Sequence, residues 1–139
     1  DVMTAQIKAA KADGYIPIVT FQHLEYYDYA ASPYLVPDFH QVAEAGAAIV
    51  SGSQAHQPHA FEFYRGAFLH YGLGNLFFDQ YGEGYAQRQA FIARYVIYDG
   101  RVISTDLITI MFVDMARPRL MLPEERQELL ETIFYASGW

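Results

Sequence analysis

The first half of the chain alternates between helical and strand-like hydrophobic patterns. Met3, Ile7 and Ala10 recur at the spacing of one helix face, which predicts a helix over residues 1–13. A short apolar run rich in β-branched residues then predicts a buried strand over residues 16–21. The segment that follows has no hydrophobic period and is expected to be a loop.

The same order of elements then repeats. Residues 37–45 predict a second helix, with Pro37 and Asp38 in its first turn and Gly46 after its last residue. Residues 47–51 predict another buried strand. Helix, strand, helix and strand in this order indicate parallel strands that are joined by crossover helices.

The second half predicts hairpins and a last helix. Two short apolar runs, 61–64 and 67–71, meet at an Arg-Gly turn, and two longer alternating runs, 89–98 and 102–113, flank an Asp-Gly turn. Pro118 is expected to end the strand region.

The last helix is expected to begin at Pro123 and to end at Gly138, with Leu129 and Ile133 on its apolar face. The sequence as a whole therefore predicts a mixed α/β fold.

Composition narrows the classes of function. The 139 residues include 9 Lys and Arg against 16 Asp and Glu, which gives a net charge of −7. Because no basic stripe is present, the chain is not expected to bind nucleic acid. The absence of cysteine excludes disulfides and thiolate metal ligands from this chain.

Polar clusters follow both predicted parallel strands. Residues 21–27 contain His23, and residues 51–59 contain His56. Because sites in parallel α/β sheets gather beyond the carboxyl ends of the strands, these clusters are candidates for metal binding or proton transfer. The alternative is that they are ordinary loop residues that bond to the backbone. The candidates for substrate binding in the two clusters are Glu25, Tyr26, Gln54 and His59.

Glycines and aromatic residues mark a further region. Residues 71–80 combine glycines with Asn75, but neither a dinucleotide-binding glycine pattern nor a phosphate-binding lysine accompanies them. The chain has 12 Tyr, 10 Phe and 1 Trp, and 14 of these 23 lie within residues 15–34 and 61–81. They either line a groove or form part of the core.

Several of these segments together resemble a known family. They are Gly46-Ala47, the loop that ends at His56, and the runs 61–64 and 71–79. This pattern resembles the poly-γ-glutamate capsule biosynthesis (CapA-like) family, which belongs to the calcineurin-like metallophosphoesterase superfamily. The resemblance implies a metallo-dependent phosphatase-like β-sandwich of two sheets flanked by helices. It also implies that residues 1–139 are the C-terminal part of one such domain.

The resemblance implies a metal site with departures from the usual pattern. In the family's Gly-x-His-x-His loop, Gln54 stands at the first histidine and His56 at the second. The family's upstream His-Trp-Gly-x-Glu-Tyr motif aligns in two ways here, since matching Glu25 places Phe21 at the histidine, whereas matching His23 leaves Glu25 two residues early. The implied metal ligands are His56, His23 and Gln54, and the implied catalytic residues are His56, His23 and Asn75.

Two functions follow as alternatives. The first is a metal-dependent, phosphoesterase-like or amide-acting hydrolase that uses Mn, Fe or Zn. The superfamily's other metal motifs are absent from these 139 residues, so an N-terminal part of the same domain is the expected partner. The second is a non-catalytic component of capsule or envelope polymer synthesis or export. Both imply partners in the polymer machinery and an envelope-associated or extracellular location.

Overall fold

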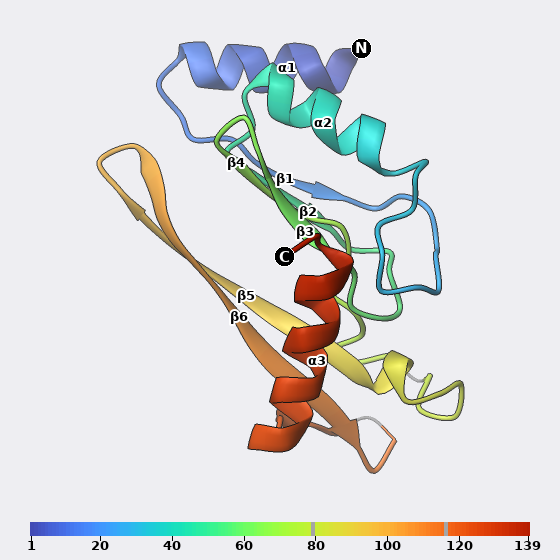
Figure 1. Ribbon diagram of the computed structural model, residues 1–139. Helices are drawn as coiled ribbons and strands as arrows, with labels where there is room; N and C mark the ends of the chain where they lie inside the picture. Colours follow the sequence, from blue (N-terminus) through green and yellow to red (C-terminus); the bar gives the residue numbers. More distant parts are fainter. Residues whose placement is uncertain (79, 116) are drawn as a thin grey trace.

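The computed structural model describes residues 1–78, 80–115 and 117–139, and its strands form two sheets (Figure 1). The first sheet has four strands in the order β1-β2-β4-β3. Its strands are β1 (Ile18–Phe21), β2 (Ile49–Gly52), β3 (Phe61–Tyr64) and β4 (Ala67–His70).

The second sheet has three strands in the order β5-β6-β7. They are β5 (Gln89–Tyr98), β6 (Arg101–Val113) and β7 (Arg117–Leu120). The helices are α1 (Val2–Ala12), α2 (Val36–Ala45), the 3-10 turn η1 (Ala86–Arg88) and α3 (Pro123–Ala136).

The predicted parallel arrangement is confirmed. β1 and β2 pair in parallel with Ile18 opposite Ile49, and α2 forms the crossover between them. β2 also pairs in parallel with β4, whereas β3 joins the edge as the antiparallel partner of β4. The carboxyl ends of β1 and β2 therefore lie at the same edge of the sheet.

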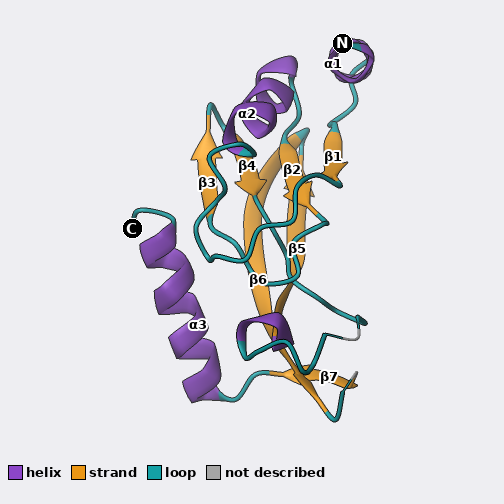
Figure 2. Cartoon of the chain, turned by 90° about the vertical axis from the view of Figure 1, so that its right-hand side faces the viewer, coloured by secondary structure: helices purple, strands orange, loops and turns teal. Residues whose placement is uncertain are grey.

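Two hydrophobic clusters hold the layers together. α1 and α2 lie over one face of the first sheet, where Phe39, Val42 and Leu69 are fully buried (Figure 2). On the other side, α3 buries Leu129 and Ile133 in a cluster with residues of both sheets. None of the described helices combines the length and the apolar character needed to cross a membrane.

The prediction that Pro118 ends the strand region is wrong. Pro118 lies inside β7, where it pairs with Phe112 of β6. A proline cannot donate a backbone hydrogen bond, but β7 is an edge strand, and edge strands tolerate this loss. The α/β class with two sheets and flanking helices is otherwise as predicted.

Candidate functional site

A polar pocket lies beyond the carboxyl ends of β1 and β2. Its volume is about 390 Å³, and loops after β1, β2 and β4 contribute its lining. Four of the predicted site residues line it, namely Glu25, Gln54, His56 and Asn75. The clusters that follow the two parallel strands therefore meet, as the strand order leads one to expect.

Glutamine side chains connect the two loops across this pocket. Gln54 donates from Nε2 to Glu25 Oε1 over 3.0 Å. Gln54 Oε1 in turn accepts a hydrogen bond of 2.8 Å from Gln22 Nε2. Both ends of the Gln54 amide are thus engaged by neighbouring side chains, and Gln54 as a metal ligand stays a prediction.

Asn75 determines how the His56 ring is oriented. Its amide nitrogen lies 3.0 Å from the backbone oxygen of His56 and 3.2 Å from that of Gln87. Because carbonyl oxygens only accept, the nitrogen must face them, and Asn75 Oδ1 then faces His56 Nδ1 at 2.9 Å. His56 Nδ1 therefore carries a hydrogen and donates it to Asn75.

The other nitrogen of the same ring faces a carboxylate. His56 Nε2 lies 3.1 Å from Glu25 Oε1. In a neutral imidazole that is protonated on Nδ1, Nε2 holds a lone pair, so two acceptors face each other here. Either an additional proton on Nε2 or a bound cation makes this arrangement favourable.

Aromatic rings enclose the His56 imidazole. Tyr27 stacks on it with ring centroids 6.3 Å apart, and Phe78 lies tilted against it at 4.8 Å. The His56 side chain is only 12% exposed, whereas Phe78 is 51% exposed. The two rings therefore shield the His56 imidazole from solvent in an otherwise polar pocket.

His23 lies apart from this pocket. Its Nε2 pairs with Asp38 Oδ2 at 2.7 Å, and its Nδ1 accepts a hydrogen bond of 2.8 Å from the backbone nitrogen of Leu24. Its ring also stacks on Phe21 with centroids 5.8 Å apart. The structure thus places Glu25, and not His23, beside His56; His23 as a metal ligand stays a prediction.

His59 and Tyr26 connect two loops, and neither residue is part of the pocket lining. The His59 ring is fully buried, and its Nε2 donates to the backbone oxygen of Tyr26 over 2.8 Å. Burial is the main cause that lowers the pKa of His59 below its ordinary value. The pair joins the loop after β1 to the loop after β2, and its role in substrate binding stays a prediction.

Sequence reasoning missed Gln22, Tyr27 and Phe78 as members of the site. Gln22 and Tyr27 belong to the polar cluster after β1, so their position close to His23 and Glu25 in the sequence could have indicated them. Phe78 follows the glycine-rich segment, where an exposed aromatic gives no periodic signal. Asp79, the last residue of the segment that resembles the family, lies outside the described residues.

The donor set of the pocket fits part of a metal site. Adjacent nitrogen and oxygen ligands of one zinc ion, each ~2.1 Å from it, lie ~3 to 3.5 Å apart. His56 Nε2 and Glu25 Oε1 have this separation, and the bond from His56 Nδ1 to Asn75 is the usual outer support of a ligating histidine. The described residues contain no group of three or more His, Asp or Glu that could hold an ion. They therefore offer two donors toward a site.

Comparisons with known proteins found one family and two relatives that are similar to this chain. The family described as bacterial capsule synthesis protein PGA_cap matches residues 1–80. Relatives from two strains of Mycobacterium tuberculosis, CDC 1551 / Oshkosh and H37Rv, are both named probable polyglutamine synthesis accessory protein. Each is 36% identical over 84 residues, which is 60% of this chain. The match covers 22% of each relative's own length.

Proposed function

The chain belongs to the bacterial capsule synthesis protein family, and we propose that it contributes to the divalent-metal site of a phosphoesterase-like hydrolase in that family. The observation that carries the proposal is the pair of His56 Nε2 and Glu25 Oε1, 3.1 Å apart, with Nδ1 of the same ring committed to Asn75. A cation that both acceptors coordinate makes this contact favourable, and it is the alternative to a second proton on His56 that a metal titration can detect.

Each residue of the pocket has a definite part in this proposal. His56 and Glu25 hold the ion, and Asn75 keeps the Nε2 lone pair directed at it. Gln54 holds the Glu25 carboxylate in position through its Nε2. A divalent ion at such a site polarises a phosphoryl or carbonyl oxygen and acidifies a bound water. The remaining ligands would come from the N-terminal part of a longer domain, with a metallophosphatase-like fold that includes residues 1–139.

A second function is favoured by the state of Gln54. Its amide is tied at both ends to Gln22 and Glu25, which makes this part of the pocket a hydrogen-bonded surface. The two relatives are named accessory proteins of a synthesis pathway. In this alternative the chain acts without catalysis, as a binding component of the capsule polymer machinery. Under either function we place the complete protein at the cell envelope or outside the cell.

Metal titration tests the first proposal directly. We expect Mn²⁺ or Zn²⁺ to bind the complete protein at one ion per molecule in calorimetry, since residues 1–139 supply only two of the ligands. His56→Ala removes a nitrogen ligand, so it is expected to weaken binding at least tenfold, or at least about 1.4 kcal/mol. His40→Ala changes a histidine that lies outside the pocket and serves as the control, with unchanged affinity expected.

The same titration separates the alternatives. His23→Ala is expected to leave the affinity unchanged if Glu25 is the upstream ligand, and to weaken it if His23 moves into the site. If no ion binds to the complete wild-type protein at one per molecule, the metal proposal fails and the accessory function is left.

The role of Asn75 has its own test. Asn75→Ala removes the acceptor at His56 Nδ1, so the ring should populate both neutral tautomers. We expect this change in the ¹⁵N shifts of the His56 ring by NMR, together with a loss of ~10-fold in metal affinity. Gln80→Ala is the matched control, because Gln80 bonds the Asn75 amide nitrogen and is not bonded to His56. Identical ring shifts in wild type and Asn75→Ala would contradict the proposed orientation.

A further inference from the structure

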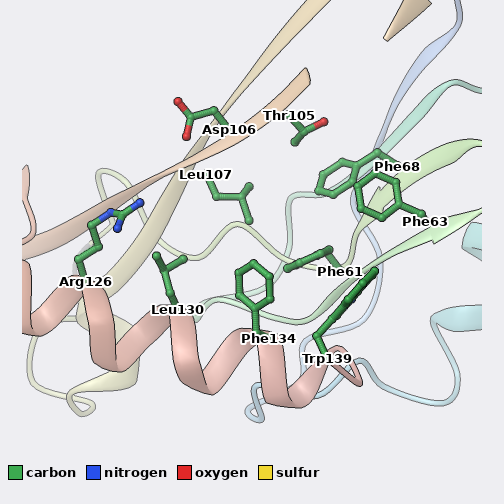
Figure 3. A pocket seen from close by; sticks show the side chains of 10 residues that line it. All are labelled: Phe61, Phe63, Phe68, Thr105, Asp106, Leu107, Arg126, Leu130, Phe134 and Trp139. Atoms are coloured by element: carbon green, nitrogen blue, oxygen red, sulfur yellow. The ribbon is translucent and has the colours of Figure 1, made fainter. Parts of the chain in front are cut away.

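A second pocket lies between α3 and the two sheets, away from the His56 site. Its volume is about 330 Å³. Figure 3 shows that its aromatic side chains gather at one end and that Arg126 stands at the other. The aromatic end is formed by Phe61, Phe63, Phe68, Phe134 and Trp139.

One face of α3 lines the pocket on the helix side. Arg126, Leu130 and Phe134 follow one another at four-residue steps, so they lie in a row along the helix. The pocket therefore changes from aromatic to charged along the helix axis. The glutamates of α3 are not part of the lining, and the nearest in sequence, Glu125, is held by Arg119 through bonds of 2.6 and 2.7 Å.

Among the described residues, the Arg126 guanidinium at the polar end has no carboxylate partner. Asp106 also lines the pocket, but its carboxylate pairs with Arg94 at 2.6 Å. Within residues 1–78, 80–115 and 117–139, no carboxylate pairs with the Arg126 guanidinium. Arg126 therefore presents an available positive charge beside an apolar cavity, in a chain whose net charge is −7.

We propose that this pocket binds a small amphipathic anion, with a medium-length acyl chain along Leu130 and the aromatic rings and an anionic head on Arg126. At ~30 Å³ for each water-sized group, the cavity accommodates about ten non-hydrogen atoms. Its size lies within the usual range of small-molecule pockets. Arg126 can bind a carboxylate or a phosphate through two parallel hydrogen bonds. This site is independent of the metal proposal, since it shares no residue with the His56 pocket.

The only tryptophan of the chain gives a direct measurement. Trp139 lines the pocket, so its fluorescence reports occupancy in residues 1–139. We expect octanoate, below its micellar concentration, to change this signal with a saturable curve. Octylamine, which has the opposite charge, should bind at least tenfold more weakly. Octyl phosphate measured beside octanoate distinguishes a lipid-type phosphate head from a free carboxylate as the preferred ligand.

Two substitutions separate the head-group contact from the apolar contact. Arg126→Gln is expected to weaken octanoate about tenfold and to leave neutral octanol unchanged. Phe134→Ala should weaken octanoate and octanol alike. Arg101→Gln, at the distant start of β6, is the control and should change neither.

Three results would overturn the proposal. The first is the absence of a saturable Trp139 signal with octanoate and octyl phosphate. The second is equal binding of octanoate and octylamine, or an Arg126→Gln variant with wild-type affinity. The third is a signal that depends on protein concentration and not on ligand, with a dimer in sedimentation, because a second copy of the chain would then occupy the pocket.

Discussion

Gly52→Ala is expected to destabilise the fold by about 3 kcal/mol, the upper end of the usual range for overpacking a core. Gly52 is the last residue of β2, where the chain turns toward the His56 loop. A Cβ atom at this position would lie 2.1 Å from the backbone oxygen of Tyr71 and 2.7 Å from its carbonyl carbon. Backbone atoms cannot move aside as a flexible side chain can, so β2 and the segment after β4 would have to separate. Urea-induced unfolding, followed by circular dichroism, measures the change.

Gly82→Ala is the matched control for this prediction. It makes the same chemical change in a loop where nothing lies within 4 Å of the added Cβ atom. We expect its free energy of unfolding to stay within about 0.5 kcal/mol of wild type. Equal stability of the two variants would show that β2 and Tyr71 do not approach as closely as the structure has them.

The convergence of the polar clusters followed from features that a sequence displays. Two apolar β-branched runs separated by a helical segment indicate parallel strands, and parallel strands end at one edge of a sheet. The polar clusters after the two strands were therefore expected near one another. Gln54 and His56 line one pocket together with Glu25, whereas His23, which was also expected there, is not part of its lining. The contribution of Asn75 follows less directly, because it depends on where the loop after β4 returns.

The orientation of individual loop side chains could not be predicted in the same way. A strand sets side-chain direction by alternation, but the segment after Phe21 has no period. The sequence left open whether the family's upstream motif aligns on His23 or on Glu25. The structure separates them because His23 pairs with Asp38 at the first turn of α2, a contact made across 15 positions of the chain.

The aromatic residues show a similar division. The sequence left open whether they form a groove or the core, and the structure contains both. Phe61 and Phe68 are buried between the sheets and α3, whereas Phe77 and Phe78 are exposed beside the His56 pocket. Both regions are rich in phenylalanine, so the residue type does not distinguish them. Whether a ring is buried or exposed depends on the tertiary packing, which the hydrophobic period does not encode.

Lowering the pH from 7.5 to 5 is expected to reduce the free energy of unfolding by about 2 kcal/mol through His70 alone, at ~1.4 kcal/mol per pH unit below the unfolded pKa. His70 is completely buried on β4, and burial lowers its pKa from 6.5 to about 3 in the folded chain. The unfolded chain takes up a proton below pH 6.5, and the folded chain does not. Stability is thus fully present above the unfolded pKa and is lost as the pH falls toward the folded one. Urea unfolding at a series of pH values measures the slope.

The dependence of the unfolding free energy on pH, and not its value at one pH, shows whether His70 causes the loss of stability. His70 Nε2 donates to the backbone oxygen of His59 over 3.1 Å, and its Nδ1 has no hydrogen-bond partner among the described residues. Its ring packs against Phe91, with centroids 5.4 Å apart, and no carboxylate of the described residues pairs with it. His70→Asn is expected to lower stability at pH 7.5 but to flatten the dependence between pH 7.5 and 5. His59, whose pKa is also lowered by burial, then accounts for the slope that remains. An unchanged slope in His70→Asn would show that the unfolded and folded chains bind protons equally at this position.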